Sequence, residues 1–221
     1  MKAVAFDLDE TLLDRTGSLK EFCRWQASVL LGMGPDESET YVARFLELDA
    51  FGSVWKDVVY AKLVCEFSLT RVDSNLLLNN YVEEFCRFCR PRPFAQECVK
   101  ELSNAGYRLA LVSNGPSPFQ EKCFKSLKID GYFDAVIVSG AIGISKPDPR
   151  IFLAMCGLLD TPPHECVFIG DNPEQDVEGA AALGMYTVFV PGPISATCSR
   201  ADVTCDDFGR LPELIATTGV R

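Results

Sequence analysis

The chain has a single histidine, His164, among its 221 residues. One imidazole excludes a metal site built from several histidines, and it leaves the rest of the chain without the base of a Ser-His-Asp triad. His164 itself stands in TPPHE, a polar loop before a predicted strand, so we expect it at the surface. Any chemistry of this chain must therefore depend on other side chains.

Basic residues are also few, with 21 Lys and Arg against 31 Asp and Glu and a formal net charge of −10. Such a chain lacks the clustered positive charge that binds nucleic acid or an anionic membrane surface, so we expect neither partner. A small anionic ligand is still compatible with this charge, because a few local groups set the field inside one cleft. The sequence does not indicate an oligomeric state.

Long apolar runs are absent as well. No run approaches the ~18 to 20 residues that a membrane span requires. The first ten residues, MKAVAFDLDE, lack the basic region, apolar stretch and cleavage site of a signal peptide. We therefore expect a cytoplasmic protein.

The ten cysteines do not form a metal-binding pattern. Most lie in apolar helical or strand-like segments, which favours reduced, buried thiols. One CxxC pair occurs, Cys86 and Cys89, but no second pair and no nearby histidine completes a zinc site, and no strand and turn precede it as in redox motifs. We expect these two residues to be structural, and the sequence does not tell whether they do anything beyond packing.

The hydrophobic pattern divides the chain into two kinds of structure. Residues 2–7 form an apolar strand, and about 17–90 show helical spacing that ends at the prolines of RPRPF, residues 90–94. Strands and helices then alternate, and 206–221 reads as one short helix and a loose tail. The alternation predicts strands at 107–114, 133–140, 165–172 and 185–191, and helices at 117–128, 148–159 and 173–184. The sequence thus predicts an α/β fold, a doubly wound, Rossmann-like parallel sheet formed by residues 1–14 and 91–221, with an all-helical domain inserted at 15–90.

Polar side chains follow these strands at their carboxyl ends, where doubly wound sheets have their sites. Aspartates at such ends suit Mg²⁺, which keeps several waters and takes one or two carboxylates plus a substrate phosphate. A lysine and short hydrogen-bonding side chains suit phosphate oxygens, and paired carboxylates can supply a nucleophile and a proton shuttle. Taken singly, each residue has a structural alternative as a helix cap, a turn or a surface lysine. The residues are Asp7, Asp9, Thr11, Ser113, Asn114, Lys146, Asp171 and Asp176.

Four motifs made of these residues resemble those of the haloacid dehalogenase superfamily. They are DxDxT at Asp7–Thr11, Ser113 after the second strand, Lys146 before Pro147, and GDxxxxD at Gly170–Asp176. The resemblance covers essentially the whole chain, and it includes a helical cap domain between the first two motifs. Phosphoglycolate phosphatases, sugar-phosphatases and nucleotidases of the superfamily share that arrangement.

The resemblance implies a role for each residue. Asp7 would attack phosphorus and form an aspartyl-phosphate, and Asp9 would protonate the leaving oxygen and later deprotonate water. Thr11 would support this geometry, and Ser113 and Lys146 would hold the phosphoryl oxygens, for which the side chain of Asn114 is also suited by its own chemistry. Many relatives have glycine where this chain has Glu10, and we expect an exposed side chain there to be tolerated. The implied magnesium ligands are Asp7, the backbone carbonyl of Asp9, and Asp171. Asp176 would contact these ligands rather than the ion.

This pattern predicts a magnesium-dependent phosphatase that hydrolyses a small phosphomonoester. A haloacid dehalogenase proper is disfavoured because such enzymes do not keep the counterpart of Asp9. A phosphomutase of the superfamily tends to have a histidine soon after the first motif, and LLDRTGSLKEF has none. A catalytically silent binding or regulatory module would be expected to lose a motif carboxylate. Phosphomutase and silent module remain the alternatives.

The sequence does not separate a sugar phosphate from a nucleotide or a phospho-acid as the substrate. Residues of the inserted domain are the expected readers of the leaving group, and the candidates are Arg15, Trp55 and Lys56. The last two belong to the segment FGSVWKD, residues 51–57. The structural alternative places Trp55 in the core of the helical domain and Lys56 in solvent.

Overall fold

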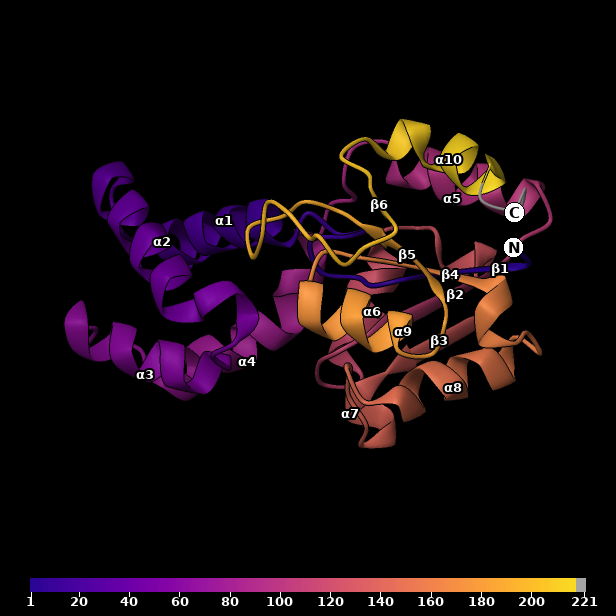
Figure 1. Cartoon of the computed structure of the whole chain (residues 1–221). Helices are drawn as coiled ribbons and strands as arrows, with labels where there is room; N and C mark the ends of the chain where they lie inside the picture. The colour runs from indigo at the N-terminus through magenta and orange to yellow at the C-terminus, as the bar shows by residue number, and fades with distance from the viewer. Residues whose placement is uncertain (218–221) are drawn as a thin grey trace. The chain divides into compact units, whose positions relative to one another are not determined.

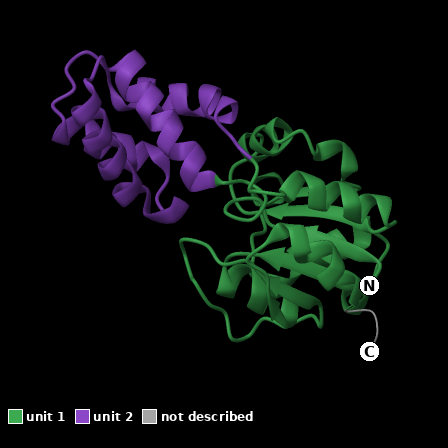
Figure 2. Cartoon of the chain, turned by 90° about the horizontal axis from the view of Figure 1, so that it is seen from above, with its two compact units in different colours: residues 1–14, 91–221 green, residues 15–90 purple. Residues whose placement is uncertain are grey.

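The computed structural model describes residues 1–217, and the chain divides into two compact units. Unit 1 comprises residues 1–14 and the chain from residue 91 onwards, and unit 2 comprises residues 15–90 (Figure 2). The identification of unit 1 as a catalytic core domain and of unit 2 as a cap domain stays a prediction.

Unit 1 contains a sheet of six parallel strands in the order β3-β2-β1-β4-β5-β6 (Figure 1). The predicted parallel α/β sheet is therefore confirmed. The strands are β1 Ala3–Phe6, β2 Arg108–Ser113, β3 Ala135–Val138, β4 Cys166–Gly170, β5 Tyr186–Phe189 and β6 Val203–Thr204.

Strand β1 lies inside the sheet because its four residues, AVAF, are apolar on both faces and fully buried. It pairs with β2 on one side and with β4 on the other. The chain runs outward from β1 through β2 to β3 and then returns to the other side of β1, so the switch point lies between β1 and β4. The residues that follow these two strands, Asp7 and Asp171, flank this switch point, where doubly wound sheets bind their ligands.

Helices cover both faces of the sheet. In Figure 1, α5 and α10 lie above the sheet and α8 and α9 lie below it. On the lower face, Phe152 of α8 packs on Phe168 of β4 with ring centroids 5.0 Å apart. The helices of unit 1 are α5 Ala95–Asn104, α6 Phe119–Ser126, α7 Ser139–Ile142, α8 Pro149–Leu158, α9 Gly179–Ala181 and α10 Leu211–Thr217. The loose tail expected after α10, at 218–221, lies outside the described residues.

The predicted helix at 173–184 begins as a wider π-helical turn, Pro173–Glu178, before the short α9. The carbonyl of Asn172 accepts from the amides of both Asp176 and Val177, at 3.0 and 3.3 Å. The side chain of Asn172 also caps this turn by accepting from the amides of residues 174 and 175. The turn places the carboxyl group of Asp176 against Gly170 at the end of β4. π-helical turns are frequent at functional sites.

Unit 2 is all-helical, with a core of aromatic side chains. Phe22, Tyr81 and Phe85 pack together with ring centroids 5.0 to 5.9 Å apart, and Phe45 packs on Tyr60 at 5.4 Å. Its helices are α1 Arg15–Trp25, the π-helical Gln26–Leu30, α2 Pro35–Asp49, α3 Lys56–Glu66 and α4 Ser74–Glu84. Among residues 1–217, no helix has the length and apolar character needed to cross a bilayer.

Candidate active site

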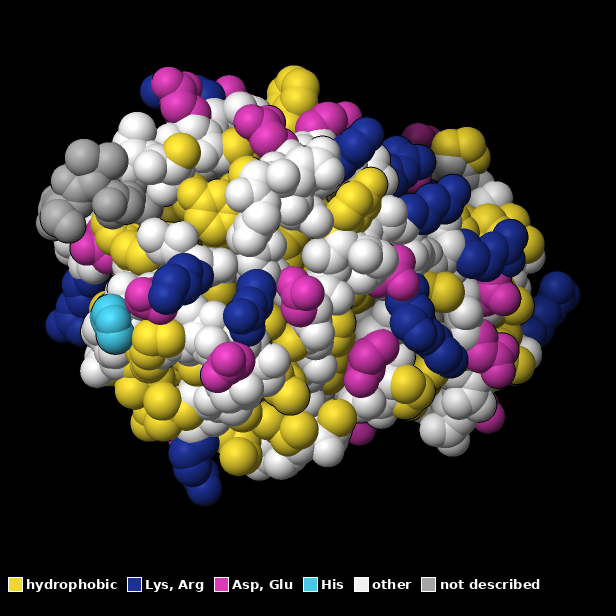
Figure 3. Space-filling model, turned by 90° about the vertical axis from the view of Figure 1, so that its right-hand side faces the viewer, with side chains coloured by type: hydrophobic (Ala, Val, Ile, Leu, Met, Phe, Trp, Pro, Cys, Tyr) yellow, Lys and Arg dark blue, Asp and Glu magenta, His cyan; other side chains and the backbone are white. Residues whose placement is uncertain are grey.

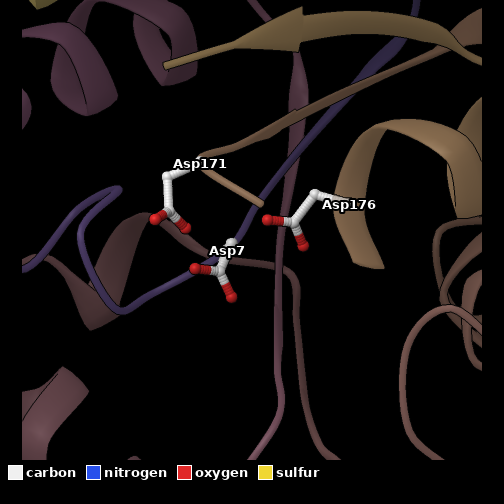
Figure 4. Close-up of side chains that lie close together, drawn as sticks. All are labelled: Asp7, Asp171 and Asp176. Atoms are coloured by element: carbon white, nitrogen blue, oxygen red, sulfur yellow. The ribbon is translucent and has the colours of Figure 1, made fainter. Parts of the chain in front are cut away.

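Three aspartates meet at the switch point of the sheet. Asp7 follows β1, Asp171 follows β4, and Asp176 lies in the π-helical turn beyond. All three are buried, and each offers a carboxylate oxygen within 4.8 Å of the others. Figure 4 shows the carboxyl groups of Asp171 and Asp176 directed towards that of Asp7. Such a group of hard oxygen atoms can hold a divalent cation.

Lys146 places one positive charge against this cluster. Its Nζ lies 2.5 Å from Oδ1 of Asp7 and 2.6 Å from Oδ1 of Asp176, and the lysine is only 3% exposed. Burial lowers the pKa of this ammonium group, but the charges of Asp176 and Asp7 outweigh burial and raise the pKa above its ordinary value. Lys146 therefore stays charged, which contradicts the structural alternative of a solvated surface lysine.

One ammonium group does not balance three carboxylates. Burial raises the pKa of Asp7 to about 7, with Lys146 opposing this rise and Asp176 adding to it. Burial and the charge of Asp7 raise the pKa of Asp171 to about 9. Within residues 1–217, Oδ2 of Asp171 is buried without a hydrogen-bond partner. The donor set therefore fits a further cation that binds through oxygen, as Mg²⁺ does.

Two hydroxyl groups are buried beside the ends of the central strands. Oγ1 of Thr11 and Oγ of Ser113 have no hydrogen-bond partner among the described residues, and the two residues are 0% and 1% exposed. Buried hydroxyls are normally paired, so each of these exceptions requires an explanation. An anionic group with several acceptor oxygens would satisfy both, as predicted for a phosphoryl group.

Asn114 has a different use from the predicted phosphate contact. Its Nδ2 donates to the carbonyl of Lys146 at 3.0 Å and to Oε1 of Gln175 at 2.9 Å, and its Oδ1 accepts from the amide of Lys146. Both polar atoms of the side chain are thus engaged in joining the loops that follow the strands. We therefore assign the Asn114 side chain to the positioning of Lys146.

Asp9 lies beside the carboxylate cluster but is not a member of it. Its Oδ2 accepts a hydrogen bond of 2.9 Å from Nε2 of Gln120, a residue of α6 that sequence reasoning missed. No local pattern signals this contact, because the two residues are 111 positions apart and on different elements. The predicted role of the Asp9 carbonyl as a metal ligand stays a prediction.

The loop between Asp9 and Thr11 is held by Arg92, a second residue that the sequence did not single out. The guanidinium group of Arg92 donates to the carbonyl of Glu10 at 2.5 Å and to that of Pro191 at 3.3 Å. Glu10 has a left-handed backbone with φ 58°, which favours glycine and matches the glycine of many relatives. The expectation of an exposed side chain at this position is wrong, because Glu10 is 9% exposed.

Gly170 makes room for Asp176 at the end of β4. A Cβ atom on this residue would lie 2.3 Å from Oδ2 and 2.5 Å from Cβ of Asp176. Any side chain at position 170 would therefore displace the aspartate that contacts Lys146.

The three predicted substrate readers belong to unit 2, and two of them share a buried ion cluster. Both guanidinium NH groups of Arg15 lie 2.9 Å from the carboxylate of Asp49, and Lys56 pairs with the same carboxylate. Lys56 is 1% exposed, so the alternative that places it in solvent is wrong. Trp55 is 37% exposed and is therefore not a core residue. A contact of these residues with the leaving group stays a prediction.

Three residues to which the sequence assigned no chemical role, His164, Cys86 and Cys89, are not among the residues of the site. His164 is exposed, as predicted, and it is the single cyan side chain in Figure 3. The thiols of Cys86 and Cys89 donate to the backbone carbonyls of residues 83 and 85, and all ten cysteines are free.

The sequence is similar to known hydrolases. A family model described as "haloacid dehalogenase-like hydrolase" matches residues 1–184. A glyceraldehyde 3-phosphate phosphatase from Methanopyrus kandleri is 28% identical over 86% of this chain and 84% of its own length. A phosphoglycolate phosphatase from Haemophilus influenzae is 27% identical over 95% and 96%, respectively. The crystal structure of a HAD phosphatase from Thermococcus onnurineus superposes with a TM-score of 0.66 at 28% identity, covering 97% of this chain and 98% of that one.

Proposed function

Because the chain belongs to the haloacid dehalogenase-like hydrolase family, we propose that it is a magnesium-dependent phosphatase of small phosphomonoesters that acts through an aspartyl-phosphate. The observation that carries this proposal is the placement of Lys146 between Asp7 and Asp176. The hydroxyl groups of Thr11 and Ser113, which are buried without a hydrogen-bond partner within residues 1–217, support it. A phosphoryl group in this place would meet an ammonium group, two hydroxyl donors and a carboxylate nucleophile.

Asp7 is the proposed nucleophile. An oxygen of its carboxylate forms a bond to phosphorus as the bond from phosphorus to the ester oxygen breaks, which leaves an acyl phosphate on Asp7. Lys146 favours the ionised form of Asp7, because it lies against the carboxylate, and so opposes the effect of burial. The buried position also keeps bulk water away from the reacting atoms.

Lys146, Thr11 and Ser113 are the proposed partners of the phosphoryl oxygens. Donors that are fixed before the reaction stabilise the charge of the transition state without having to reorganise. Phosphoryl transfer depends mostly on positioning and on such charge stabilisation. Asn114 supports this set by holding the backbone of Lys146.

The metal would be held by Asp7, Asp171 and the backbone carbonyl of Asp9, with Asp176 adjoining them. When bound, Mg²⁺ supplies positive charge that compensates the surplus of carboxylates and offsets the charge of the phosphoryl oxygens. The partnerless Oδ2 of Asp171 supports this assignment.

Asp9 is the proposed acid and base. Its carboxyl proton passes to the leaving ester oxygen, and the resulting carboxylate later takes a proton from the water that hydrolyses the acyl phosphate. A haloacid dehalogenase needs no such proton transfer to its halide, so the presence of Asp9 supports a phosphatase. The named relatives above are phosphatases of small three-carbon and two-carbon phosphate esters.

Phosphate release from a panel of phosphomonoesters in the presence of Mg²⁺ tests the proposal. The panel starts with glyceraldehyde 3-phosphate and phosphoglycolate and extends to sugar phosphates and nucleotides. We expect release by the wild type and none by Asp7→Asn, while Asp130→Asn, an exposed aspartate outside the site, keeps wild-type activity. Acid quenching and mass spectrometry should locate the trapped phosphoryl group on Asp7.

A chelator should stop turnover, and added Mg²⁺ should restore it. Unchanged rates in chelator would remove the metal from the mechanism, and activity in Asp7→Asn would remove the proposed nucleophile. Transfer of the phosphoryl group to a second sugar hydroxyl in place of water would identify a phosphomutase. A folded wild type that is inactive on every ester would favour the silent module.

The same panel addresses two further predictions. Arg15, Trp55 and Lys56 are the residues of unit 2 that we propose to select the leaving group, so their variants should change the ranking of substrates. We also propose a cytoplasmic location, and the ten free cysteines support it, because reduced thiols persist in that compartment.

A further inference from the structure

Gln120 is a buried amide in the first turn of α6 that makes two hydrogen bonds in the region of the site. It is 4% exposed. Its Nε2 donates to Oδ2 of Asp9 at 2.9 Å and to the backbone carbonyl of Asn114 at 3.1 Å. One side-chain amide thus connects the loop after β1 with the end of β2.

The surroundings of Gln120 are built to fix this side chain. Gly115 lies against it, and a Cβ atom on Gly115 would come within 2.8 Å of both Cγ and Nε2 of Gln120. The second acceptor, Asn114, is itself held by the backbone of Lys146 and by Gln175. The amide of Gln120 therefore belongs to a hydrogen-bonded network that runs from Lys146 through Asn114 and Gln120 to the carboxyl group of Asp9.

We propose that Gln120 is the positioning residue for proton transfer by Asp9, an inference that rests on the phosphatase function proposed above. In the first step, an oxygen of Asp7 bonds to phosphorus, the bond from phosphorus to the ester oxygen breaks, and the proton of the Asp9 carboxyl group moves to that oxygen. Gln120 touches none of these reacting atoms of the substrate. It holds Oδ2 of Asp9, and so sets the plane of the carboxyl group that must face the leaving oxygen.

This role predicts a dependence on the leaving group. An alkyl ester releases a strongly basic alkoxide, which must be protonated as it departs, whereas 4-nitrophenyl phosphate releases a stable phenolate that needs no proton. A misplaced Asp9 should therefore slow the cleavage of the first kind of ester and spare that of the second. A residue that only supports the fold would affect both esters alike.

The test compares Gln120→Met with the wild type in the first turnover, by rapid quench, so that the later hydrolysis of the acyl phosphate does not limit the signal. The two substrates are 4-nitrophenyl phosphate and the alkyl phosphate that the wild type cleaves fastest. We expect Gln120→Met to cleave the alkyl ester about tenfold more slowly, as loss of the hydrogen bond that orients the Asp9 carboxyl group implies. Release of nitrophenolate should stay within about threefold of the wild type.

Two companion variants separate positioning from folding. Gln120→Asn keeps the amide but shortens the side chain by one methylene group, and we expect the same selective loss. Gln96→Met is the control for loss of a glutamine amide. The exposed Gln96 also donates from its Nε2 to a backbone carbonyl, that of Leu127 at 2.8 Å, which follows α6 and is not one of the proposed site residues. This variant should cleave both esters at wild-type rates. Inhibition by inorganic phosphate should be unchanged in all three variants, because Gln120 is not among the proposed phosphate contacts.

Equal slowing of both esters in Gln120→Met and Gln120→Asn would overturn the inference, as would wild-type rates with the alkyl ester. Lost inhibition by inorganic phosphate would also overturn it, because it would mean that the phosphate site itself had changed. A wild type that cleaves neither ester would overturn the proposed function and this inference with it. An active wild type with unselective variants would overturn the role of Gln120 alone.

Discussion

At the scale of single residues, Oδ2 of Asp171 is the atom that most clearly lacks a binding partner in the site. This oxygen is buried and has no hydrogen-bond partner within residues 1–217, and its carboxyl group lies among two others that share one ammonium group. Such an arrangement costs folding free energy, because buried carboxylates without a partner are unfavourable. Active sites commonly carry this kind of cost in exchange for binding.

Asp171→Asn should therefore stabilise the metal-free protein. In chelator at neutral pH, we expect the free energy of unfolding to rise by about 1 kcal/mol. Burial raises the pKa of Asp171 to about 9, so folding must either take up a proton or bury a charge there, and asparagine requires neither. The same variant should lose most of the gain in melting temperature that Mg²⁺ gives the wild type. Thermal unfolding with chelator and with Mg²⁺ measures both effects, and activity is not needed as a readout.

The exposed Asp130→Asn serves as the control and should behave like the wild type in both conditions. A lower melting temperature of Asp171→Asn in chelator would show that the carboxylate stabilises the fold. An unchanged response to Mg²⁺ in that variant would exclude Asp171 as a ligand.

At the scale of elements, the connection between α2 and α3 has an unusual backbone. Three successive residues, Ala50, Phe51 and Gly52, have φ values of 46°, 54° and 87°. For the first two this left-handed conformation is strained, so neighbouring contacts must hold it. Asp49 provides them, since its carboxylate accepts from the amide of Gly52 at 2.9 Å and pairs with Arg15 and Lys56. The ion cluster therefore fixes the shape of this loop.

Acid should weaken this ion cluster. Burial raises the pKa of Asp49, but the hydrogen bonds and charges of Arg15 and Lys56 outweigh it and hold the pKa below its ordinary value. A carboxyl group with a lowered pKa contributes stability above the pKa of the unfolded chain, about 4, and that contribution is lost as the pH falls further. Chemical denaturation between neutral pH and about pH 3 should show this loss in the wild type.

Asp49→Asn should already lack this contribution at neutral pH. We expect a cost of about 3 kcal/mol or more there, because two buried cations lose their counter-ion, and a smaller difference from the wild type in acid. Asp57→Asn, an exposed aspartate of α3, is the matched control and should follow the wild type throughout. A difference between Asp49→Asn and the wild type that grows in acid would contradict the assignment.

At the scale of the whole molecule, the proposed chemistry belongs to unit 1 alone. The three clustered aspartates, Lys146 and the two partnerless hydroxyls all lie in residues 1–14 or 91–217, although the chain leaves this unit for 76 residues between them (15–90). The strand order explains this, because a sheet brings the ends of β1, β2 and β4 together whatever is inserted between them.

Hydrogen exchange should divide the response to the metal in the same way. Added Mg²⁺ should slow amide exchange in β1, β4 and the loops after them, since a bound cation stabilises the segments that hold it. Amides of α2 and α3 in unit 2 should exchange at the same rate with and without Mg²⁺. Slower exchange in α2 and α3 but not in β1 would contradict the assignment, because it would mean that Mg²⁺ binds to unit 2.

The sheet could be predicted from the sequence because its signal is local. Five strands are mostly apolar runs bounded by turns, and the candidate site residues lie at the ends of four of them or in the segments that follow. The sixth, Val203–Thr204, is too short to leave a pattern. The π-helical turn at Pro173–Glu178 was also beyond prediction, because it differs from an ordinary helix only in which amides the carbonyl of Asn172 accepts.

The contacts that refine the site could not be predicted, because they join residues that are far apart in sequence. The use of Gln120 depends on the position of Asp9, and the burial of Lys56 depends on Asp49 in another helix. A charged residue in the sequence is expected in solvent only when no oppositely charged side chain is available to pair with it. Tertiary packing decides whether such a side chain is near. The side chain of Asn114 shows the same limit. Its amide suits a phosphate oxygen, but in the structure it forms hydrogen bonds with the backbone of Lys146.

Because β4 ends in a glycine, Gly170, adding a single methyl group there would disturb the site. Asp176 occupies the space above Gly170 where any side chain would begin, and it is also a partner of Lys146. Alanine at position 170 would displace Asp176 and so remove one of the two carboxylates that hold the Lys146 ammonium group. The displacement of Lys146 would in turn change the charge beside Asp7, which follows the neighbouring strand β1. A substitution that alters no charged or polar atom would thus impair the nucleophile indirectly. A screen for inactive variants should therefore find substitutions at position 170 as well as at the aspartates.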